Sequence, residues 1–222
     1  MRKILIFYFL INLTYIKIDA QMQHNQIKLP APVTESKTSI EKAIKERRSI
    51  RKYRNIALSI NELSQLLWAG QGITDSFNKY RSYPSAGALF PLELYVAINK
   101  VEKIEKGLYY YDPFKHVLIK KSDKDIIPEI TQAALNQQFI NESAIVLIYT
   151  AIKSRSTSRY GERGLRYIYM EAGHAAQNIY LQAVSLNLGV VVIGAFIDKE
   201  ISKILNLKDD EIPVYIIPVG KK

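Results

Sequence analysis

Hydrophobic residues recur three and four positions apart in five stretches of the chain, which is the spacing of one face of an α-helix. These stretches are 38–48, 59–69, 124–138, 162–187 and 198–206. Two of them begin with a capping-box pair, Thr38 with Glu41 and Ser59 with Glu62. The longest carries the small residues 172, 173, 175 and 176 near its middle, so another backbone could approach it closely. We expect this helix to lie at the centre of the fold or at a dimer interface.

Short apolar runs bounded by turn residues predict strands at 92–98, 144–151, 190–196 and 214–220. The stretch 107–121 predicts a hairpin with Asp112 and Pro113 in its turn. Helices and strands mix without strict βαβ alternation, a pattern typical of an α+β fold rather than a doubly wound one. Neither GxGxxG after a strand nor GxxxxGK[ST] occurs.

The first twenty residues have the layout of a secretory signal peptide. Arg2 and Lys3 precede an apolar run over 4–16, and the small residue Ala20 follows. The run is too short to span a bilayer comfortably, so no membrane span is expected in the mature chain. We expect export to the periplasm or another extracytoplasmic space, with a cytoplasmic protein as the alternative. Residues 21–37, with Pro30 and Pro32, are interpreted as a linker and 38–222 as one domain.

The composition narrows the chemistry. The formal charge is +10, and removal of residues 1–20 would leave 28 basic and 20 acidic residues, a charge of +8. A basic surface suits an anionic partner. Cysteine is absent, which excludes thiolate nucleophiles, disulfides and cysteine-bound metal. The three histidines, His24, His116 and His174, are not spaced as metal ligands, so no metal site is expected.

Five basic residues crowd around one serine at the end of the first predicted helix. The segment "RRSIRKYR" places Arg47, Arg48 and Arg51 beside Ser49. If the helix breaks there, these guanidinium groups could converge on one point while the hydroxyl donates a hydrogen bond. Planar guanidinium groups match phosphate oxygens. The alternative is a solvated basic surface, which is common for such runs.

Two small-residue segments suit a flat ligand. Pro84, Ser85, Ala86 and Gly87 form a loop just before the strand at 92–98, where backbone amides would be accessible. The strand "GVVVIGAF" carries Ile193, Gly194 and Ala195 at its end, where backbone N–H groups could also face a ligand. An ordinary turn and a plain strand end are the respective alternatives.

Together these segments resemble the nitroreductase superfamily, with the closest likeness to its SagB-type (McbC-like) dehydrogenases. The resembling pieces are "ERRSIRKY", "YPSAGALFPLELYV", "RYGERGLRYIYMEAGHAAQNIYLQA", "LGVVVIGAF" and "PVGKK", which together cover about residues 40–222. The resemblance implies a mainly antiparallel sheet flanked by helices. It also implies a domain-swapped homodimer with FMN at the interface.

The resemblance also assigns FMN-binding residues. Arg47, Arg48, Ser49 and Arg51 correspond to the phosphate and pyrimidine ligands. The loop 84–87 corresponds to the partner subunit's cover over the isoalloxazine, and 193–195 to the N–H groups near flavin N5 and O4. Gln138 corresponds to another polar contact with the flavin, and Lys221 could reach the phosphate.

One position departs from the SagB-type pattern. Azoline oxidases of that branch carry a Lys-Tyr pair before the long helix, and here the dipeptide is Arg159-Tyr160. Arginine stays protonated, so it cannot act as a base. Tyr160 could donate a proton, or it could simply pack at the helix entry. His174, Glu171 and Asn178 on the long helix are expected to be structural.

The resemblance predicts an FMN-dependent oxidoreductase that transfers a hydride, or two electrons, through flavin N5 to or from a small molecule or peptide. NAD(P)H is the usual donor in this family, although an exported enzyme would lack it. The alternative is a non-catalytic module that binds flavin, another anion or nucleic acid. Nucleic acid is disfavoured because the basic residues cluster in one short segment.

Overall fold

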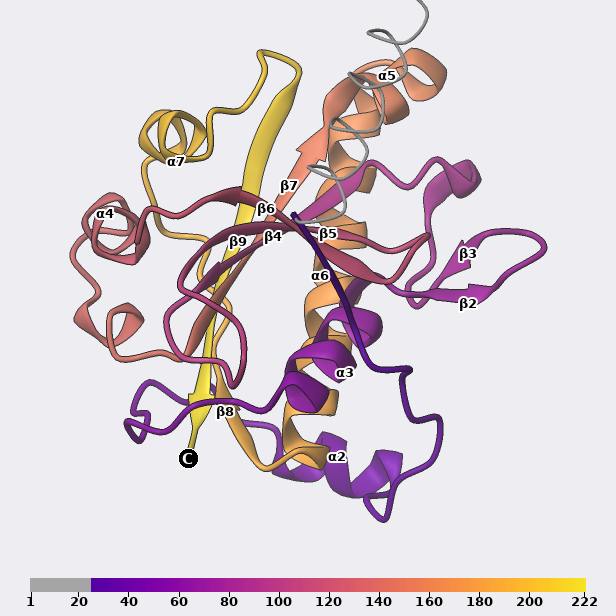
Figure 1. The fold of residues 1–222 in the computed structure, drawn as a ribbon. Helices are drawn as coiled ribbons and strands as arrows, with labels where there is room; N and C mark the ends of the chain where they lie inside the picture. Colours follow the sequence, from indigo (N-terminus) through magenta and orange to yellow (C-terminus); the bar gives the residue numbers. More distant parts are fainter. Residues whose placement is uncertain (1–24) are drawn as a thin grey trace, which may run out of the picture.

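A seven-stranded sheet forms the centre of the molecule, and all of its strand pairs are antiparallel (Figure 1). This computed structural model describes residues 25–222, so the predicted signal peptide lies outside the described residues. The spatial order is β1-β6-β5-β4-β7-β9-β8. Its strands are β1 (Gln26–Lys28), β4 (Leu92–Ile98), β5 (Gly107–Asp112), β6 (Val117–Ser122), β7 (Ile145–Ile152), β8 (Leu188–Val190) and β9 (Glu211–Lys221). The α+β prediction is therefore confirmed.

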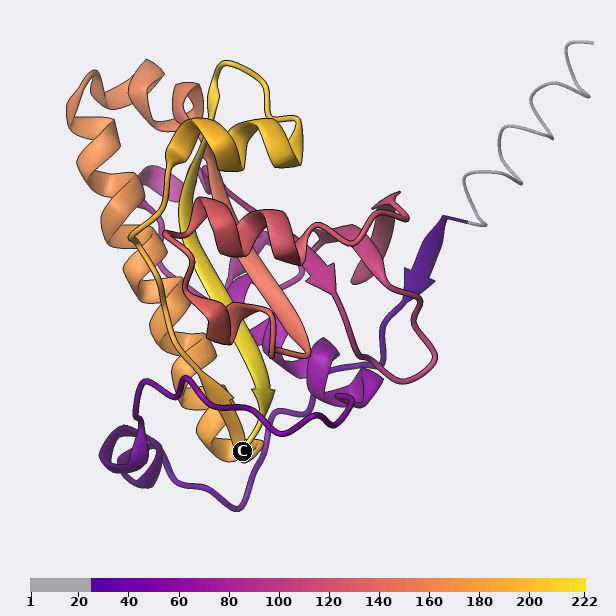
Figure 2. The same cartoon turned by 90° about the vertical axis from the view of Figure 1, so that its left-hand side faces the viewer.

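Helices cover both faces of this sheet. They are α2 (Ile40–Glu46), α3 (Ile60–Gln71), α4 (Ile127–Ala133), α5 (Lys153–Tyr160), α6 (Arg163–Ser185) and α7 (Asp198–Leu205). Helices α3 and α6 pack on one face, and α4 and α7 pack on the other (Figure 2). A two-stranded hairpin, β2 (Ile73–Asp75) with β3 (Tyr80–Arg81), projects from the side of the molecule.

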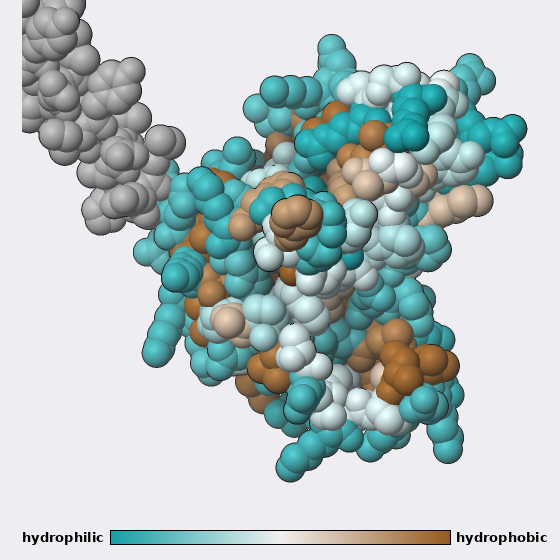
Figure 3. Space-filling view, turned by 90° about the vertical axis from the view of Figure 1, so that its right-hand side faces the viewer, coloured by the Kyte–Doolittle hydropathy of each residue, from teal (hydrophilic) through white to brown (hydrophobic). Residues whose placement is uncertain are grey.

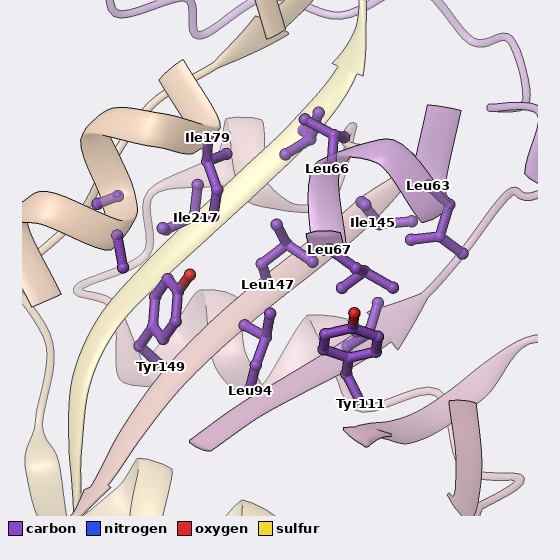
Figure 4. Packing of buried hydrophobic residues seen from close by; sticks show 14 of the residues in the cluster. Leu63, Leu66, Leu67, Leu94, Tyr111, Ile145, Leu147, Tyr149, Ile179 and Ile217 are labelled. Atoms are coloured by element: carbon purple, nitrogen blue, oxygen red, sulfur yellow. The ribbon is translucent and has the colours of Figure 1, made fainter. Parts of the chain in front are cut away.

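The larger core lies between the sheet and the α3–α6 pair. Figure 4 shows Leu63, Leu66 and Leu67 of α3 pointing toward the sheet, where Leu147 lies on β7. All four side chains are fully buried. Burial of such leucines stabilises the fold by roughly 1.5–3 kcal/mol each. The core therefore fixes α6, the helix to which the candidate site is attached, against the sheet.

Most predicted elements are confirmed, including the long helix and the capping box. Ser59 accepts a hydrogen bond from the Glu62 N–H, and the Glu62 carboxylate accepts one from the Ser59 N–H. The first helix differs by one residue, because its N-cap is Ser39 rather than Thr38. The Ser39 hydroxyl accepts from the Lys42 N–H at 3.2 Å. A serine directly before the apolar stripe is the better-placed cap.

Two elements are shorter than predicted. The helix expected over 124–138 is limited to α4, because Pro128 occupies its first turn and the backbone turns left-handed at Leu135 and Asn136. The strand expected over 190–196 ends at Val190, and beyond it only Ile193 bridges to Ile216 of β9. The chain thus leaves the sheet at a point where Gly194 and Ala195 become exposed.

The described part of the predicted linker belongs to the folded body. Residues 26–28 form β1, which pairs with β6, and Leu29 is buried in the main core. Val33 exchanges two backbone hydrogen bonds with the Gln65 side chain, at 2.8 and 3.0 Å. The described part of the stretch interpreted as a linker over 21–37 is thus bound to the sheet and to α3. A three-residue strand with a single apolar position gives too short a pattern to detect.

No helix within residues 25–222 combines the length and the apolar character that a membrane span requires.

Candidate functional site

The arginine segment begins where α2 ends. The helix stops at Glu46, and Arg47 already has an extended ψ of 123°. The Ile50 N–H donates to the Val190 carbonyl at 2.9 Å, which ties the segment to the end of β8. Gly189 of β8 allows this close approach, because a Cβ there would lie 2.8 Å from the Ile50 side chain. The helix therefore ends three residues before the break considered at Ser49, and the segment lies beside the 190–196 stretch.

Tyr180 of α6 connects these two stretches. Its hydroxyl lies 2.9 Å from Ser49 Oγ and accepts a hydrogen bond from the Val192 N–H at 3.0 Å. The Arg47 guanidinium lies over the Tyr180 ring, 5.1 Å from its centroid. Stacking of this kind orients a guanidinium without neutralising its charge. Tyr180 therefore holds Ser49, Arg47 and the 192 backbone in one place.

The arginines of this segment carry charge that no carboxylate balances. Within residues 25–222, none of Arg47, Arg48 and Arg51 has a carboxylate oxygen within 4 Å. Arg48 bonds instead to the carbonyls of Lys45 and Arg47 at the end of its own helix. Arg51 lies 5.9 Å from the centre of the Phe139 ring. Arg47 and Arg51 are therefore the two guanidinium groups available to an external anion.

The stretch 193–195 supplies free backbone donors next to this charge. Gly194 and Ala195 are exposed, and neither N–H has a protein acceptor among the described residues. A Cβ at Gly194 would meet only Tyr215, at an ordinary 3.7 Å, so the surface there is open. Gln137 reaches this stretch, because its amide lies 3.4 Å from the Ala195 carbonyl. The predicted Gln138 instead bonds locally, to the Asn136 carbonyl and to Asn141.

The backbone of Lys221, but not its side chain, contacts the arginine segment. The Arg54 N–H donates to the Lys221 carbonyl at 2.9 Å. The Lys221 ammonium pairs with the Glu62 carboxylate at the start of α3. Burial raises the pKa of Glu62, but the hydrogen bonds from Lys221 and Ser59 outweigh it and leave the pKa lowered. An anion would have to compete with Glu62 for this ammonium.

The loop 84–87 has an unusual backbone. Gly87, Ala88 and Phe90 all have positive φ angles, of 62°, 55° and 45°. Left-handed non-glycine residues are uncommon and cluster at functional sites. Ser85 stabilises the turn, since its hydroxyl accepts from the Phe90 N–H at 2.9 Å. The loop is thus held in a strained conformation by specific contacts.

The dipeptide Arg159-Tyr160 lies directly against this loop. A Cβ at Gly87 would be 2.7 Å from the Tyr160 hydroxyl and 2.8 Å from Arg159 Nη1. The Arg159 guanidinium lies 5.4 Å from the centroid of the Tyr160 ring. Tyr167 of α6 packs edge-on against Tyr160, with 5.0 Å between ring centroids. Glycine adopts the positive φ at position 87 without strain and lets the loop approach the Tyr160 hydroxyl closely.

A buried carboxyl group supports the loop from α6. Glu171 is 3% exposed, and its Oε1 accepts from the Ala86 N–H at 3.0 Å. Its Oε2 is buried without a hydrogen-bond partner. Burial raises the pKa of Glu171, and the hydrogen bonds from Ala86 and Ser85 offset part of this effect. Asn178 also binds this region, donating to the Ser82 carbonyl at 2.8 Å.

Helix α5 fastens the other end of the loop. Arg155 Nη1 donates to the Phe90 carbonyl at 3.0 Å and pairs with Glu93 Oε1 at 2.5 Å. Glu93 is 6% exposed, whereas the Arg155 side chain is 37% exposed, so only the carboxylate of the pair is shielded from solvent. The loop is therefore anchored by one buried carboxyl group and one guanidinium at its two ends.

The two groups of residues lie on opposite sides of α6. The arginine segment contacts Tyr180, and the loop contacts Glu171, nine positions earlier. Nine residues correspond to about two and a half turns and about 14 Å along the axis. The contacts therefore point in opposite directions from the helix. A single chain does not bring the loop 84–87 to the arginines, although the sequence assigns both to one site.

Sequence reasoning did not identify several of these supporting residues. Phe139, Gln137 and Arg155 lie outside the motifs, and Tyr180 lies within the long-helix motif but was assigned no role. Glu171 was expected to be structural, and it supports the loop by accepting from the Ala86 N–H. The available signal was a polar residue, such as Glu171, that faces inward on an otherwise apolar helix stripe. Such a residue predicts a buried hydrogen-bond partner but does not identify it.

Comparison with known proteins identifies the family. A family model described as "Nitroreductase family" matches residues 44–221. The chain is 45% identical over 183 residues to "Putative nitroreductase MJ1384" of Methanocaldococcus jannaschii, covering 82% of this chain and 91% of that protein.

Two further proteins show the same relationship. The structure of a protein titled a "putative nitroreductase" from Ralstonia eutropha JMP134 superposes with a TM-score of 0.79 at 28% identity, covering 89% of each chain. The microcin B17-processing protein McbC of Escherichia coli is 26% identical over 170 residues, covering 72% of this chain and 61% of McbC. The chain belongs to the nitroreductase family and is an oxidoreductase of that family.

Proposed function

We propose that the protein is an FMN-dependent oxidoreductase of the SagB-type branch, and that each FMN is bound between two chains. Members of the nitroreductase family typically bind FMN. The observation that carries the proposal is the pair Arg47 and Arg51, which have no carboxylate oxygen within 4 Å among residues 25–222. Their segment is tied through Ile50 and Tyr180 to the 190–195 stretch, where the N–H groups of Gly194 and Ala195 have no acceptor within the same residues. A phosphate with a flat, hydrogen-bonding ring system matches this donor set.

Each residue of the arginine side has a distinct task. Arg47 and Arg51 would hold the phosphate, Ser49 would donate to it, and Arg48 would add charge from the end of α2. Gly194 and Ala195, with Ile193 before them, would donate to the ring edge. Gln138 and Lys221 are peripheral ligands, because their side chains already bond to Asn136 and Glu62.

The loop 84–87 would come from the partner subunit of a homodimer. Pro84 and Gly87 are exposed, and the loop lies on the opposite side of α6 from the arginines of its own chain. Tyr169 and Met170 on α6 are 55% and 52% exposed, and Ile40 and Ile44 on α2 are 55% and 59% exposed. Figure 3 shows one face of the chain with several such apolar areas. Burial of these side chains in a dimer would stabilise it.

FMN, when bound, supplies two-electron chemistry, with a hydride exchanged at N5. The chain would orient FMN and the substrate, add positive charge and move a proton. Positive charge from the arginines near the ring would favour an electron-rich ring system. Because an arginine side chain cannot act as a base, the Tyr160 hydroxyl is the group of this dipeptide that would give a proton to the substrate. The substrate is a small molecule or peptide, with NAD(P)H as a candidate donor.

Purification followed by an absorption spectrum tests this proposal. We expect a yellow protein whose visible bands fade on anaerobic reduction, with FMN released on denaturation. The Tyr160→Phe variant should keep the colour and lose turnover by roughly 10²-fold or more, the typical contribution of a general acid. A colourless protein that takes up no added FMN would contradict the proposal.

A further inference from the structure

A cavity of about 370 Å³ lies at the far end of the loop, away from the arginine segment. It is bounded by the end of the loop at Ala88–Phe90, by Arg81 after the β2–β3 turn, by Glu93 of β4, by Phe114 in the β5–β6 turn and by Arg155 of α5. Small-molecule sites typically occupy about 300–1,000 Å³. The cavity therefore has room for a small ligand.

Arg81 places an unbalanced positive charge in the wall of this cavity. The side chain is 9% exposed, and within residues 25–222 no carboxylate oxygen lies within 4 Å of it. Its Nη1 donates to the Leu92 carbonyl at 3.1 Å and to the Tyr83 hydroxyl at 3.4 Å. Its Nε is buried without a partner. Burial of a charge without a counter-charge is costly, so a bound anion would stabilise this arrangement.

The acidic residue in the same wall, Glu93, already has two side-chain partners. Glu93 pairs with Arg155 at 2.5 Å and accepts from the Tyr110 hydroxyl at 2.5 Å. With Arg81 and Lys79, the lining carries three basic side chains and one acidic side chain. The surplus is positive, which favours an anionic ligand over a neutral or cationic one.

Two phenylalanine rings define the apolar part of the cavity. The centres of the Phe90 and Phe114 rings lie 5.1 and 5.7 Å from the Arg81 guanidinium carbon. Phe114 is 62% exposed, so its ring is available for contact at the mouth of the cavity. The rings hold the guanidinium plane through its π-faces and leave the charge unneutralised. A planar apolar group could lie along the same rings.

We propose that this cavity binds a small carboxylate with a planar apolar body, such as an aromatic carboxylate. Arg81 Nη2, the guanidinium nitrogen that is neither buried nor hydrogen-bonded among the described residues, donates to the carboxylate. Phe90 and Phe114 contact the apolar part. Since Phe90 belongs to the strained loop that carries Gly87 against Tyr160, a ligand here lies next to the loop that the proposed flavin site uses. A role for this carboxylate as the substrate of the oxidoreductase would rest on the proposed function, whereas its binding to the cavity does not.

Calorimetric titration of the purified protein with benzoate, and with neutral benzamide as its matched control, tests the site. We expect saturable benzoate binding at least ten times tighter than benzamide binding. Arg81→Met should remove this preference, and Arg81→Lys should retain part of it. Phe114→Ala, which changes an exposed side chain and leaves the fold intact, should weaken benzoate binding several-fold while benzamide stays weak.

The Arg47→Ala/Arg51→Ala variant separates this site from the flavin site. The benzoate preference should persist in that variant even when FMN is lost. No saturable benzoate binding, equal binding of benzoate and benzamide, or a preference that survives both Arg81→Met and Phe114→Ala would overturn the proposal. A colourless protein that keeps the benzoate preference would refute the flavin proposal alone.

Discussion

The arginine segment 47–51 and the loop 84–87 differ in how each is prepared for a ligand. The arginine segment has relaxed backbone and surplus charge, since Arg47 and Arg51 face no carboxylate among the described residues. The loop carries no charge of its own but has a strained backbone, held by Glu171 below and Arg155 beside it. In the proposed site the first region would bind by electrostatics and the second by shape. We therefore expect the two regions to respond differently to substitution, since in the proposed dimer neither is a complete site alone.

Removal of the charge should have the largest effect. Arg47→Ala/Arg51→Ala deletes two charge-assisted contacts, worth together at least roughly 3 kcal/mol. We expect the Kd for FMN to rise at least ~100-fold, measured by fluorescence titration of the apoprotein. Lys52→Ala, an exposed neighbour of equal charge, is the matched control and should change the Kd only slightly. Retention of colour in the double variant would refute the phosphate assignment.

A change of loop shape should have the next largest effect. Gly87→Val places a branched side chain at a φ of 62° and against the Tyr160 hydroxyl. The strain and clash should cost about 2 kcal/mol and weaken FMN binding roughly 30-fold. Ala88→Gly is the control, since glycine relieves the positive φ at 88 and should leave FMN affinity unchanged. An FMN affinity in Gly87→Val as high as in Ala88→Gly and the wild type would show that loop shape does not matter.

The Lys221–Glu62 pair tests how far the arginine region extends. Lys221→Met should lower the free energy of unfolding by about 1 kcal/mol at pH 7, because the pair is partly buried. Since the pKa of Glu62 is lowered in the folded chain, the difference should shrink as the pH falls through that pKa and Glu62 becomes protonated. FMN affinity should fall much less than in the arginine variant. If FMN affinity in Lys221→Met fell as far as in Arg47→Ala/Arg51→Ala, the Lys221 ammonium would have to bind the phosphate.

Glu171 should give the smallest effect on binding and a distinctive effect of pH. Glutamine keeps an oxygen for the Ala86 N–H, so FMN affinity in Glu171→Gln should change less than about threefold. Because burial raises the pKa of Glu171, the folded chain binds more protons there than the unfolded chain, and the wild type loses stability as the pH rises through this pKa. The variant should lack this loss, as followed by urea unfolding between pH 4 and 8. If the free energies of unfolding of the wild type and of Glu171→Gln changed with pH in the same way, the raised pKa of Glu171 would be refuted.

The sequence predicted the regular elements well because their patterns are local. The Ser59–Glu62 capping box, the strand 92–98 and the long helix are each specified by residues within one turn or one strand. The strand expected over 190–196 was wrong because its later part turns away from β9, and the apolar run cannot show this. The β1 strand was missed because its stability comes from pairing with β6, far along the chain.

The candidate site was predicted only as far as its motifs extend. The arginine segment and the loop were recognisable, but Tyr180, Arg155 and Arg81 were not, because each acts through a partner distant in sequence. The charge surplus at Arg81 is visible only once the positions of the carboxylates are known. That the loop and the arginines lie on opposite sides of α6 likewise follows from contacts, not from spacing.

The most direct test of a site shared between two chains is complementation. Two differently tagged chains, one with Arg47→Ala/Arg51→Ala and one with Gly87→Val, are co-expressed, and the heterodimer is isolated through both tags. If the loop of one chain completes the arginine side of the other, one of its two sites is intact, and it should hold about one FMN while each variant homodimer holds almost none. If each site forms within one chain, both sites carry a defect, and a heterodimer as colourless as the homodimers would contradict the account.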